Sequence, residues 1–404
     1  MIKEICIENY KSIQSRDAMP RVSTRVSTLE LGRVTVLIGE NGCGKSNILE
    51  AIALSAAAAA DKLDNEFLAP RGIRATEPHL MRAAFNKENV TQEIKISLNG
   101  DNDLSFVYRL QNSNHPYSNW TNEISFKTNE REAYLSLILE KLRDNPPSKE
   151  DNAEIMNQKI KEVAESLNNE PEYIKEKASS FAKNKKYLSH FIIYSPEYHC
   201  LRNFKEEGQI QPLGINGEGL FKLLQVLSLD KEKLDEIKEK LKLMGWFKDF
   251  QVPQNSSIGE RAIQIEDRYL DQEITFDQRS TNEGFLFLLF YFCLFISEDT
   301  PPFFAIDNID ASLNPKLCRR LIKELVNLAK KYDKQVIFTT HNPAILDGLN
   351  LNDDEQKLFV VSRNRSGYTR AKRFLKPETP EGEEPITLSE AFLRGYIGGL
   401  PKSF

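Results

Sequence analysis

The first part of the chain combines alternating and continuous apolar patterns. Residues Ile2–Glu8 alternate between apolar and polar side chains, as in a strand with one buried face. Residues 33–38 form a β-branched run, and the Ala- and Leu-rich segment Asn47–Ala60 that follows predicts a helix. The stretches Ile94–Ser97 and Leu104–Leu110 alternate again and predict a pair of antiparallel strands.

The middle of the chain changes character. From Arg131 to about Lys186 it is charged and helical, which indicates either a solvated helical insertion or an arm that faces a partner or DNA. Phe191–Tyr194 then predicts a strand that returns to the core. Helical segments are expected up to about Phe250, followed by a hairpin of Ile263–Glu266 and Glu273–Phe276.

The last third alternates between strands and helices. The apolar segment Gly284–Ile296 predicts a buried helix, and Phe303–Ile306 predicts a strand. A helix over Pro315–Tyr332 and a strand over Gln335–Thr339 follow. This order is typical of a parallel sheet with crossover helices, so we expect an α/β fold.

Composition and charge narrow the class of protein. Of the 404 residues, 40% are hydrophobic and 28% are charged, which is sufficient for a packed core. A net charge of −5, from 54 basic and 59 acidic residues, argues against an electrostatic grip on nucleic acid along the whole chain. A local basic cluster from Arg363 to Arg373, around an expected turn at Ser366 and Gly367, favours phosphate contact and a solvated strand pair equally.

The cysteines and the apolar runs indicate the cellular compartment in which the protein is expected. The five cysteines are scattered and form no C-x-x-C pair, which suits a reducing cytoplasm better than a disulfide framework or a zinc site. The N-terminus lacks the apolar run of a signal peptide. The longest apolar stretch, Phe285–Ile296, is too short to span a bilayer of roughly 30 Å. We therefore expect a cytoplasmic protein without a membrane span.

One motif carries the main chemistry. The sequence from Gly39 to Ser46, GENGCGKS, fits the P-loop pattern G-x-x-x-x-G-K-[ST] between an expected strand and an expected helix. Glycines allow the loop to turn its N–H groups toward phosphate oxygens, and the helix N-terminus adds its positive end. The predicted ligands of ATP are Gly39, Asn41, Gly42, Cys43, Gly44, Lys45, Ser46 and Asn47.

A second element is expected to serve the same site. The Ser46 hydroxyl in the P-loop is the first predicted ligand of Mg²⁺. Asp307 follows the apolar strand Phe303–Ile306, where the carboxylate would complete the metal shell. The sequence therefore predicts ATP with Mg²⁺ as the cofactors.

Several segments together resemble the RecF, SMC and OLD group of ABC-type ATPases. The opening IENYKSI (residues 7–13) and IGENGCGKSNILEAI (residues 38–52) carry the first part of the resemblance. Four further segments follow in the order of this family. They are a signature loop at residues 280–285, an acidic strand end at 307–310, a dimer-contact loop at 311–315 and a switch-histidine segment at 336–343.

The resemblance implies a P-loop NTPase head of the ABC type with a mixed sheet, an antiparallel β subdomain and a helical insertion. Residues 1–130 would form its N-terminal part, 131–260 the helical insertion and helical lobe, and 261–404 its C-terminal part. Two heads would dimerise head to tail around ATP, or assemble into a higher homo-oligomer. The signature loop of one copy would contact the nucleotide of the other through Ser280, Asn282, Glu283 and Gly284.

The chain departs from the family pattern at two positions. The family places a glutamate after the strand-end aspartate to activate water, whereas this chain has Asn308, which cannot accept a proton as a carboxylate does. Asp310 and His341 are the remaining candidates for a catalytic role. In the signature loop, Asn282 stands where the family has a serine. We therefore expect tight ATP binding and slow or absent hydrolysis.

Two functions fit this pattern. The resemblance to stand-alone heads of anti-phage systems, such as the ATPases of Septu and PARIS, implies a sensor and scaffold for a separate nuclease or toxin. Only about sixty residues follow His341, which is too few for the nuclease domain of OLD proteins. The alternative is a RecF-like repair ATPase that binds nucleic acid directly.

Overall fold

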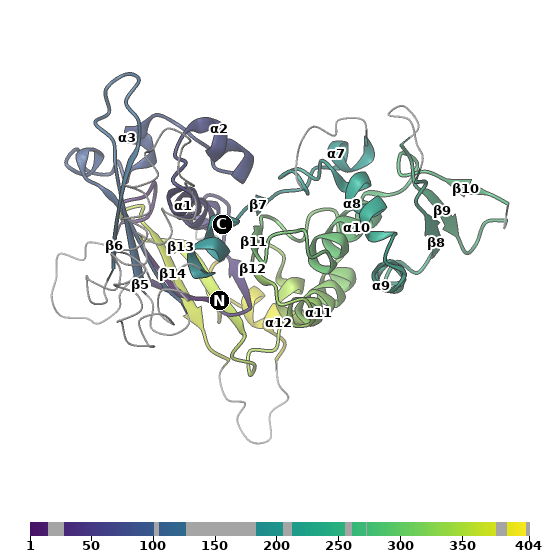
Figure 1. Cartoon of the computed structure of the whole chain (residues 1–404). Helices are drawn as coiled ribbons and strands as arrows, with labels where there is room; N and C mark the ends of the chain where they lie inside the picture. The colour runs from purple at the N-terminus through teal and green to yellow at the C-terminus, as the bar shows by residue number, and fades with distance from the viewer. Residues whose placement is uncertain are drawn as a thin grey trace, which may run out of the picture.

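The fold was examined in a computed structural model that describes residues 1–14, 28–100, 105–126, 183–204, 212–254, 261–271, 273–376 and 386–400. Most of the charged helical stretch expected from Arg131 to Lys186 lies outside these residues. The described residues form an α/β fold with two main sheets and a helical lobe (Figure 1).

A six-stranded sheet forms the centre of the molecule, in the order β14-β13-β3-β12-β11-β7. All neighbouring strands pair in parallel except β13 and β14, so the sheet is mixed as expected. The strands are β3 (Val34–Ile38), β7 (Ile193–Tyr194), β11 (Phe303–Ile306), β12 (Gln335–Thr340), β13 (Gln356–Arg363) and β14 (Thr369–Phe374).

An antiparallel sheet in the order β2-β1-β4-β5-β6 covers one side of the central sheet. Helix α1 (Lys45–Ala59) lies between the two sheets, and all its residues except Ser46 and Asn47 are buried. An Ala- and Leu-rich helix suits this position because small side chains allow close approach on every side. The strands are β1 (Ile2–Glu8), β2 (Thr28–Glu30), β4 (Ile94–Gly100), β5 (Ser105–Gln111) and β6 (Thr121–Phe126).

Helices α10 (Glu283–Ile296) and α11 (Pro315–Lys331) pack on the opposite side of the central sheet. Successive side chains of a strand point to opposite faces. Val336 and Phe338 of β12 accordingly join the core under α10 and α11, while Ile337 between them joins the core around α1. This division into two faces also separates the polar residues at the end of β12.

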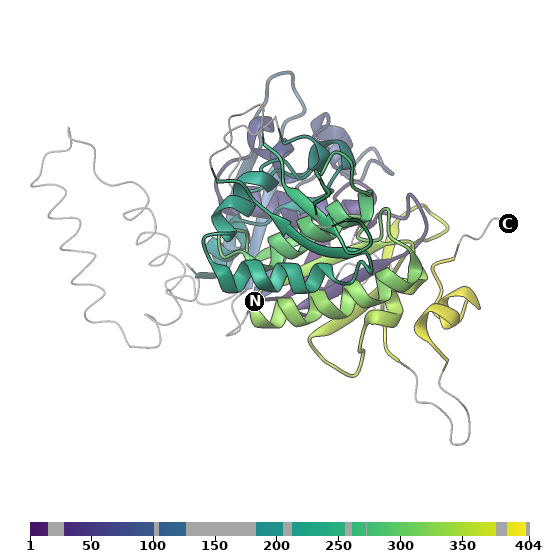
Figure 2. The ribbon, with the colours of Figure 1, turned by 90° about the vertical axis from the view of Figure 1, so that its right-hand side faces the viewer.

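The helical lobe extends from the edge of the central sheet (Figures 1 and 2). It contains α7 (Tyr198–Arg202), α8 (Leu220–Leu227), α9 (Lys231–Leu241) and a three-stranded sheet of β8 (Phe247–Gln251), β9 (Gln264–Asp267) and β10 (Thr275–Phe276). The hairpin of β9 and β10 confirms the prediction. The expectation of helix up to Phe250 is wrong, because residues 247–251 pair with β9 as a strand and bury two phenylalanines.

Short elements complete the described fold. They are α2 (Asn65–Leu68), η1 (Ala69–Arg71), α3 (Pro78–Met81), η2 (Asn89–Thr91), η5 (Pro343–Gly348) and α12 (Leu388–Leu393). Within the described residues, no helix is both long enough and apolar enough to cross a bilayer.

Gln335 connects the two main sheets. Its side chain is 1% exposed and lies at the start of β12. The Nε2 group donates to the carbonyl oxygens of Ile2 at 2.7 Å and Gly32 at 3.0 Å, and Oε1 accepts from the N–H of Ile2 at 3.0 Å. One amide side chain thus satisfies three buried main-chain groups of the neighbouring layer.

We predict that Gln335→Leu lowers the free energy of unfolding by about 3 kcal/mol, since each buried polar group left without a partner costs about 1–3 kcal/mol. Urea unfolding of the purified variant would measure the change. The matched control is Gln264→Leu on the exposed face of β9, for which we expect a change within about 0.5 kcal/mol. Equal stability of the two variants would contradict this role of Gln335.

Candidate functional site

The P-loop joins β3 to α1 in a conformation that depends on glycine at two positions. A Cβ atom at Gly39 would lie 2.0 Å from the carbonyl oxygen of Val361. Gly44 has a φ of 106°, and a Cβ there would lie 2.1 Å from Oγ1 of Thr369. Helix α1 begins directly after Gly44 without a side-chain cap, so its first N–H groups have no side-chain acceptor from the cap position.

Lys45 holds its ammonium group inside this loop. The residue is 5% exposed, and Nζ donates to the carbonyl oxygens of Gly39 at 2.7 Å and Glu40 at 3.0 Å. Among the described residues, no carboxylate lies within ion-pair distance of this ammonium group. A buried positive charge that has only neutral hydrogen-bond partners favours an anionic ligand at the loop.

His341 lies beside Lys45 at the end of β12. Its Nδ1 atom is 3.1 Å from Nζ of Lys45. An ammonium group can only donate, so Nδ1 accepts this hydrogen bond and the proton of the neutral imidazole is on Nε2. The exposed imidazole therefore presents an N–H donor at the mouth of the loop.

Ser46 and Asp307 meet although they are far apart in the sequence. The Ser46 hydroxyl donates to Oδ2 of Asp307 at 2.9 Å, and Thr339 donates to Oδ1 of the same carboxylate. Neighbouring ligand oxygens in an octahedral Mg²⁺ shell with bonds of about 2.1 Å lie about 3 Å apart. The hydroxyl and the carboxylate therefore fit two adjacent positions of such a shell.

Asp310 lies on the other face of the sheet. Thr340, the neighbour of Thr339 in β12, donates to Oδ1 of Asp310 at 2.5 Å. Burial raises the pKa of Tyr291 on α10, and the charge of Asp310 raises it further. Asp310 is therefore placed under α10 and α11, whereas Asp307 faces the P-loop.

Asn308 adopts a left-handed backbone conformation with a φ of 56°. Its N–H group donates to Oγ1 of Thr339 at 2.9 Å, and its side chain is exposed. Asparagine tolerates this conformation better than most residues. The turn thus holds an amide at the position next to the Asp307 carboxylate.

Two hydroxyl groups that were not among the predicted site residues pack against the P-loop and the first turn of α1. Thr369 of β14 donates to the carbonyl oxygen of Cys43 at 2.8 Å, and its hydroxyl lies 2.7 Å from that of Ser12. Asn47 in the first turn of α1 donates to the Ser12 hydroxyl at 2.6 Å. Ser12 lies in the motif IENYKSI, which gave a signal in the sequence. Thr369 gave no such signal, because it is 326 residues from Cys43 and reaches the loop only through the pairing of strands.

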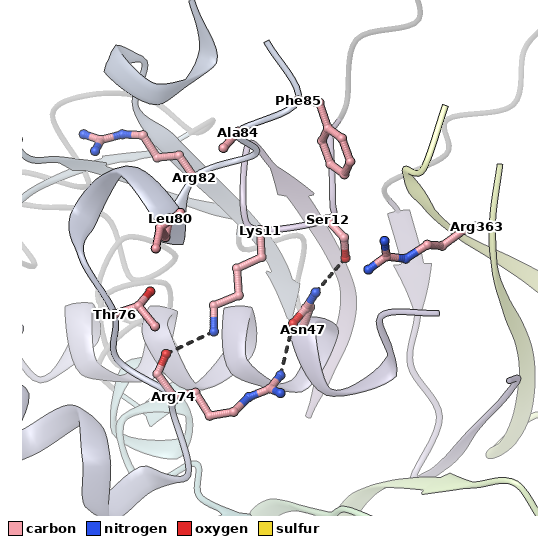
Figure 3. A pocket seen from close by; sticks show the side chains of 10 residues that line it. All are labelled: Lys11, Ser12, Asn47, Arg74, Thr76, Leu80, Arg82, Ala84, Phe85 and Arg363. Carbon is pink, nitrogen blue, oxygen red and sulfur yellow. Dashed lines mark hydrogen bonds between the residues drawn. The ribbon is translucent and has the colours of Figure 1, made fainter. Parts of the chain in front are cut away.

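A pocket of about 460 Å³ adjoins this end of α1 (Figure 3). It is lined by basic side chains and by Leu80 and Phe85, which are 51% and 42% exposed. Glu50, which is buried, pairs with Lys11 and with Arg74, the latter at 2.5 Å. The basic side chains are Lys11, Arg74, Arg82 and Arg363. A ligand with a phosphate and an apolar body matches these walls.

The signature loop is the N-terminal cap of α10. Oδ1 of Asn282 accepts from the N–H group of Phe285 at 3.0 Å, which leaves the Asn282 amide nitrogen as a donor. Glu283 accepts a hydrogen bond from Ser312 at 2.6 Å and so joins the signature loop to the dimer-contact loop. Ser280 is exposed just before the helix, and Gly284 lies in its first turn.

One chain does not bring the signature loop and the P-loop together. Helix α1 lies beside the antiparallel sheet, and α10 lies toward the helical lobe (Figure 1). The predicted site residues therefore form two groups. The first contains the P-loop, Asp307, Asn308 and His341, and the second contains Ser280, Asn282, Glu283 and Gly284.

The basic cluster at β13 and β14 forms the predicted hairpin. Arg363 lines the pocket beside the P-loop, and Arg373 pairs with Glu30 of β2. Arg373 is thus engaged within the chain, whereas the exposed side chain of Arg363 faces the pocket beside the P-loop. Within the described ranges, no group of three His, Cys, Asp or Glu side chains could hold a metal ion by itself.

Comparison with known proteins agrees with this geometry. Residues 34–347 match the protein family described as "AAA domain, putative AbiEii toxin, Type IV TA system". No curated protein matches the sequence.

Solved SMC head structures share the fold. An SMC head bound to the C-terminal winged-helix domain of ScpA is similar at a TM-score of 0.54 and 16% identity, over 93% of this chain and 98% of that chain. The SMC head with an extended coiled coil from Pyrococcus furiosus, bound to the C-terminal domain of ScpA, gives a TM-score of 0.49 at 15% identity, over 93% and 96% of the two chains. At such identities the first similarity establishes the fold and nothing finer.

We predict that Asn282→Ala lowers the free energy of unfolding by about 1 kcal/mol through loss of the helix cap. Asn282→Asp keeps a capping oxygen and should remain within about 0.5 kcal/mol of the parent protein. Urea unfolding of both variants, with Ser280→Ala as the control beside the cap, would measure these differences. An alanine variant as stable as the aspartate variant would argue against the cap.

Proposed function

Because this chain belongs to the AAA domain family that it matches over residues 34–347, we propose that it binds ATP with Mg²⁺ and uses ATP to hold an assembled state. Hydrolysis is slow in this proposal, and the protein acts as a nucleotide-gated sensor and scaffold. The observation that carries it is the meeting of Ser46 and Asp307 at 2.9 Å beside the buried ammonium group of Lys45.

In the proposed complex, the P-loop N–H groups and Lys45 bind the phosphates. Ser46 and Asp307 hold Mg²⁺, which would neutralise charge on the β- and γ-phosphates. Thr339 orients the Asp307 carboxylate. The pocket next to α1 receives the nucleoside, where Leu80 and Phe85 offer apolar surface and Arg74 offers a positive charge.

Slow hydrolysis follows from the groups around the proposed phosphate site. Asn308 can position water but cannot take its proton. Asp310 is bonded to Thr340 on the face of the sheet that α10 and α11 cover, so it is poorly placed to replace the missing base. His341 offers a donor N–H and accepts from Lys45, which suits recognition of a phosphate better than removal of a proton.

The proposed assembly is a head-to-tail dimer or a higher homo-oligomer. The signature loop and the P-loop lie in different parts of one chain, so a second copy is needed to place both on one triphosphate. The amide nitrogen of Asn282 would donate to the γ-phosphate, and Ser280 and the N–H of Gly284 would contribute further donors. Bound ATP then stabilises the dimer by mass action.

The biological setting that we propose is anti-phage defence with a separate nuclease or toxin as the effector. The description of the matched family names a putative toxin of a type IV toxin–antitoxin system, and the SMC head with a TM-score of 0.54 was solved with the C-terminal winged-helix domain of ScpA. Both descriptions support a role in which the ATPase holds a partner. Direct binding of nucleic acid is less well supported, since the net charge is −5 and Arg373 of the β13–β14 hairpin pairs with Glu30.

We predict that Lys45→Ala abolishes ATP binding and the ATP-dependent increase in mass, because the phosphates lose their buried positive charge. Light scattering coupled to size exclusion, with and without ATP and Mg²⁺, would measure assembly. Lys62→Ala, an exposed lysine after α1, is the control and should assemble normally. The same Lys45→Ala exchange in the native operon should remove phage protection in a plaque assay. Assembly that survives Lys45→Ala would refute gating by ATP.

We predict that the parent protein hydrolyses ATP below roughly 1 s⁻¹ in a single-turnover assay, the low end for ordinary enzymes. Asn308→Glu should raise the rate at least about tenfold by supplying a general base. Asn308→Gln is the matched control of the same length without a carboxylate. Fast turnover by the parent, or equal rates for the two variants, would contradict this account.

A further inference from the structure

A second cavity of about 980 Å³ lies between the two lobes at the β7 edge of the central sheet. It shares no lining residue with the pocket beside the P-loop. One wall contains η1 and residues 183–192, and the other contains residues 212–218 and 298–302. Its volume is at the upper end of the range for small-molecule sites, roughly 300–1,000 Å³.

The first wall concentrates positive charge. Lys183, Lys186 and His190 follow one another at helical spacing and are exposed to the cavity, and Arg71 joins them from η1. Among the residues that the structure describes, Lys183, Lys186 and Arg71 form no ion pair with a carboxylate. The two lysines and Arg71 therefore face the cavity without a carboxylate partner on their own wall.

Arg71 is the most unusual group on this wall. Its guanidinium stacks on Phe67 at 3.5 Å from the ring centroid, and Nη2 donates to the carbonyl oxygen of Ser189 at 3.1 Å. The Nε group is buried and has no hydrogen-bond partner in the described part of the chain. Burial lowers the pKa of Arg71 to about 10. A partly buried cation without a carboxylate partner is costly, and an anion in the cavity would offset that cost.

The second wall carries three carboxylates. Glu218 accepts from the N–H and the side-chain amide of Asn216 at 3.0 and 2.9 Å, and Glu298 pairs with Lys233 at 2.8 Å. Asp299 is the remaining carboxylate of this wall. The cations Arg71, Lys183 and Lys186 thus lie on the first wall, and the three carboxylates lie on the second wall.

Apolar side chains lie between the charged groups. Ile192 borders the first wall, and Leu213 and Ile215 face it from the second. Tyr187 adds an aromatic ring that stacks on Phe303 at a centroid distance of 5.7 Å. The cavity therefore offers apolar side chains next to the cations of the first wall.

We propose that this cavity is an effector site for a small amphipathic anion. The flat apolar body of the ligand packs against Ile192, Leu213 and Ile215, and its phosphate, sulfonate or carboxylate group binds Arg71 and Lys186. This ligand class matches both properties of the cavity, since the apolar surface alone would take a neutral molecule and the cations alone would take a free anion.

The site is connected to the P-loop site through β7. The N–H of Ser195 donates to the carbonyl oxygen of Ile215 at 2.8 Å, and the N–H of Asp307 donates to that of Tyr194 at 2.8 Å. A ligand that shifts the 212–218 loop would therefore move the strand that positions Asp307. This expectation rests on the proposed function: the effector and ATP should change each other's affinity by the same factor.

The test uses 8-anilinonaphthalene-1-sulfonate as the probe, with binding followed by fluorescence on the full chain. We expect one site per chain, and a weakening of at least about tenfold with N-phenyl-1-naphthylamine, which has the same apolar body without the sulfonate. Arg71→Gln and Lys186→Glu should each weaken the sulfonate by a similar factor. The matched controls are Arg365→Gln and Lys231→Glu, two exposed sites outside the cavity.

The outcomes separate this site from the proposed ATP site. Lys45→Ala should leave probe binding unchanged while it removes ATP binding, and Lys186→Glu should do the reverse. The effector site would be refuted if Lys186→Glu, an exposed change that leaves the core intact, bound the sulfonate as tightly as the parent protein. Binding of the probe without any change in ATP affinity would refute the coupling but keep the site.

Discussion

The burial of α1 between two sheets is the constraint on which the candidate site depends. All residues of the helix except Ser46 and Asn47 are buried, so packing against both sheets fixes its position. Its N-terminus is therefore held at the carboxyl ends of β3, β11 and β12. This is the place where open parallel sheets bind ligands, because loops diverge there and leave a crevice.

The two faces of β12 then divide the polar groups at this crevice. Thr339 turns toward α1 and bonds to Asp307, whereas Thr340 turns toward α10 and α11 and bonds to Asp310. The two aspartates are three positions apart in sequence but serve different layers. This division places Asp307 beside the P-loop and Asp310 away from it, which is the arrangement on which the proposal of slow hydrolysis rests.

Further contacts connect the helical lobe with the central sheet. The signature loop caps α10 and bonds through Glu283 to Ser312, so its geometry follows that of the loop after Asp307. The inter-lobe cavity borders β7, whose backbone also bonds to Asp307. The Glu283–Ser312 bond and the bond between Tyr194 and Asp307 connect α10 and β7 to the segment that begins at Asp307. A ligand or partner that moves one lobe has a short physical route to the proposed metal site.

The sequence by itself determined the P-loop and the strand–helix order of the last third, because these depend on local periodicity and on residues adjacent in the chain. The ABC-type head was expected only from the resemblance of several motifs to a known family. The sequence also identified Asn308 and Asn282 as departures from the family pattern. Only the tertiary structure decided which side chains meet. Ser12 and Thr369 support the P-loop from opposite ends of the chain, and Asp310 lies on the face away from Asp307. Such contacts depend on strand order and on which face each residue takes, and neither is written in the spacing of residues along the sequence.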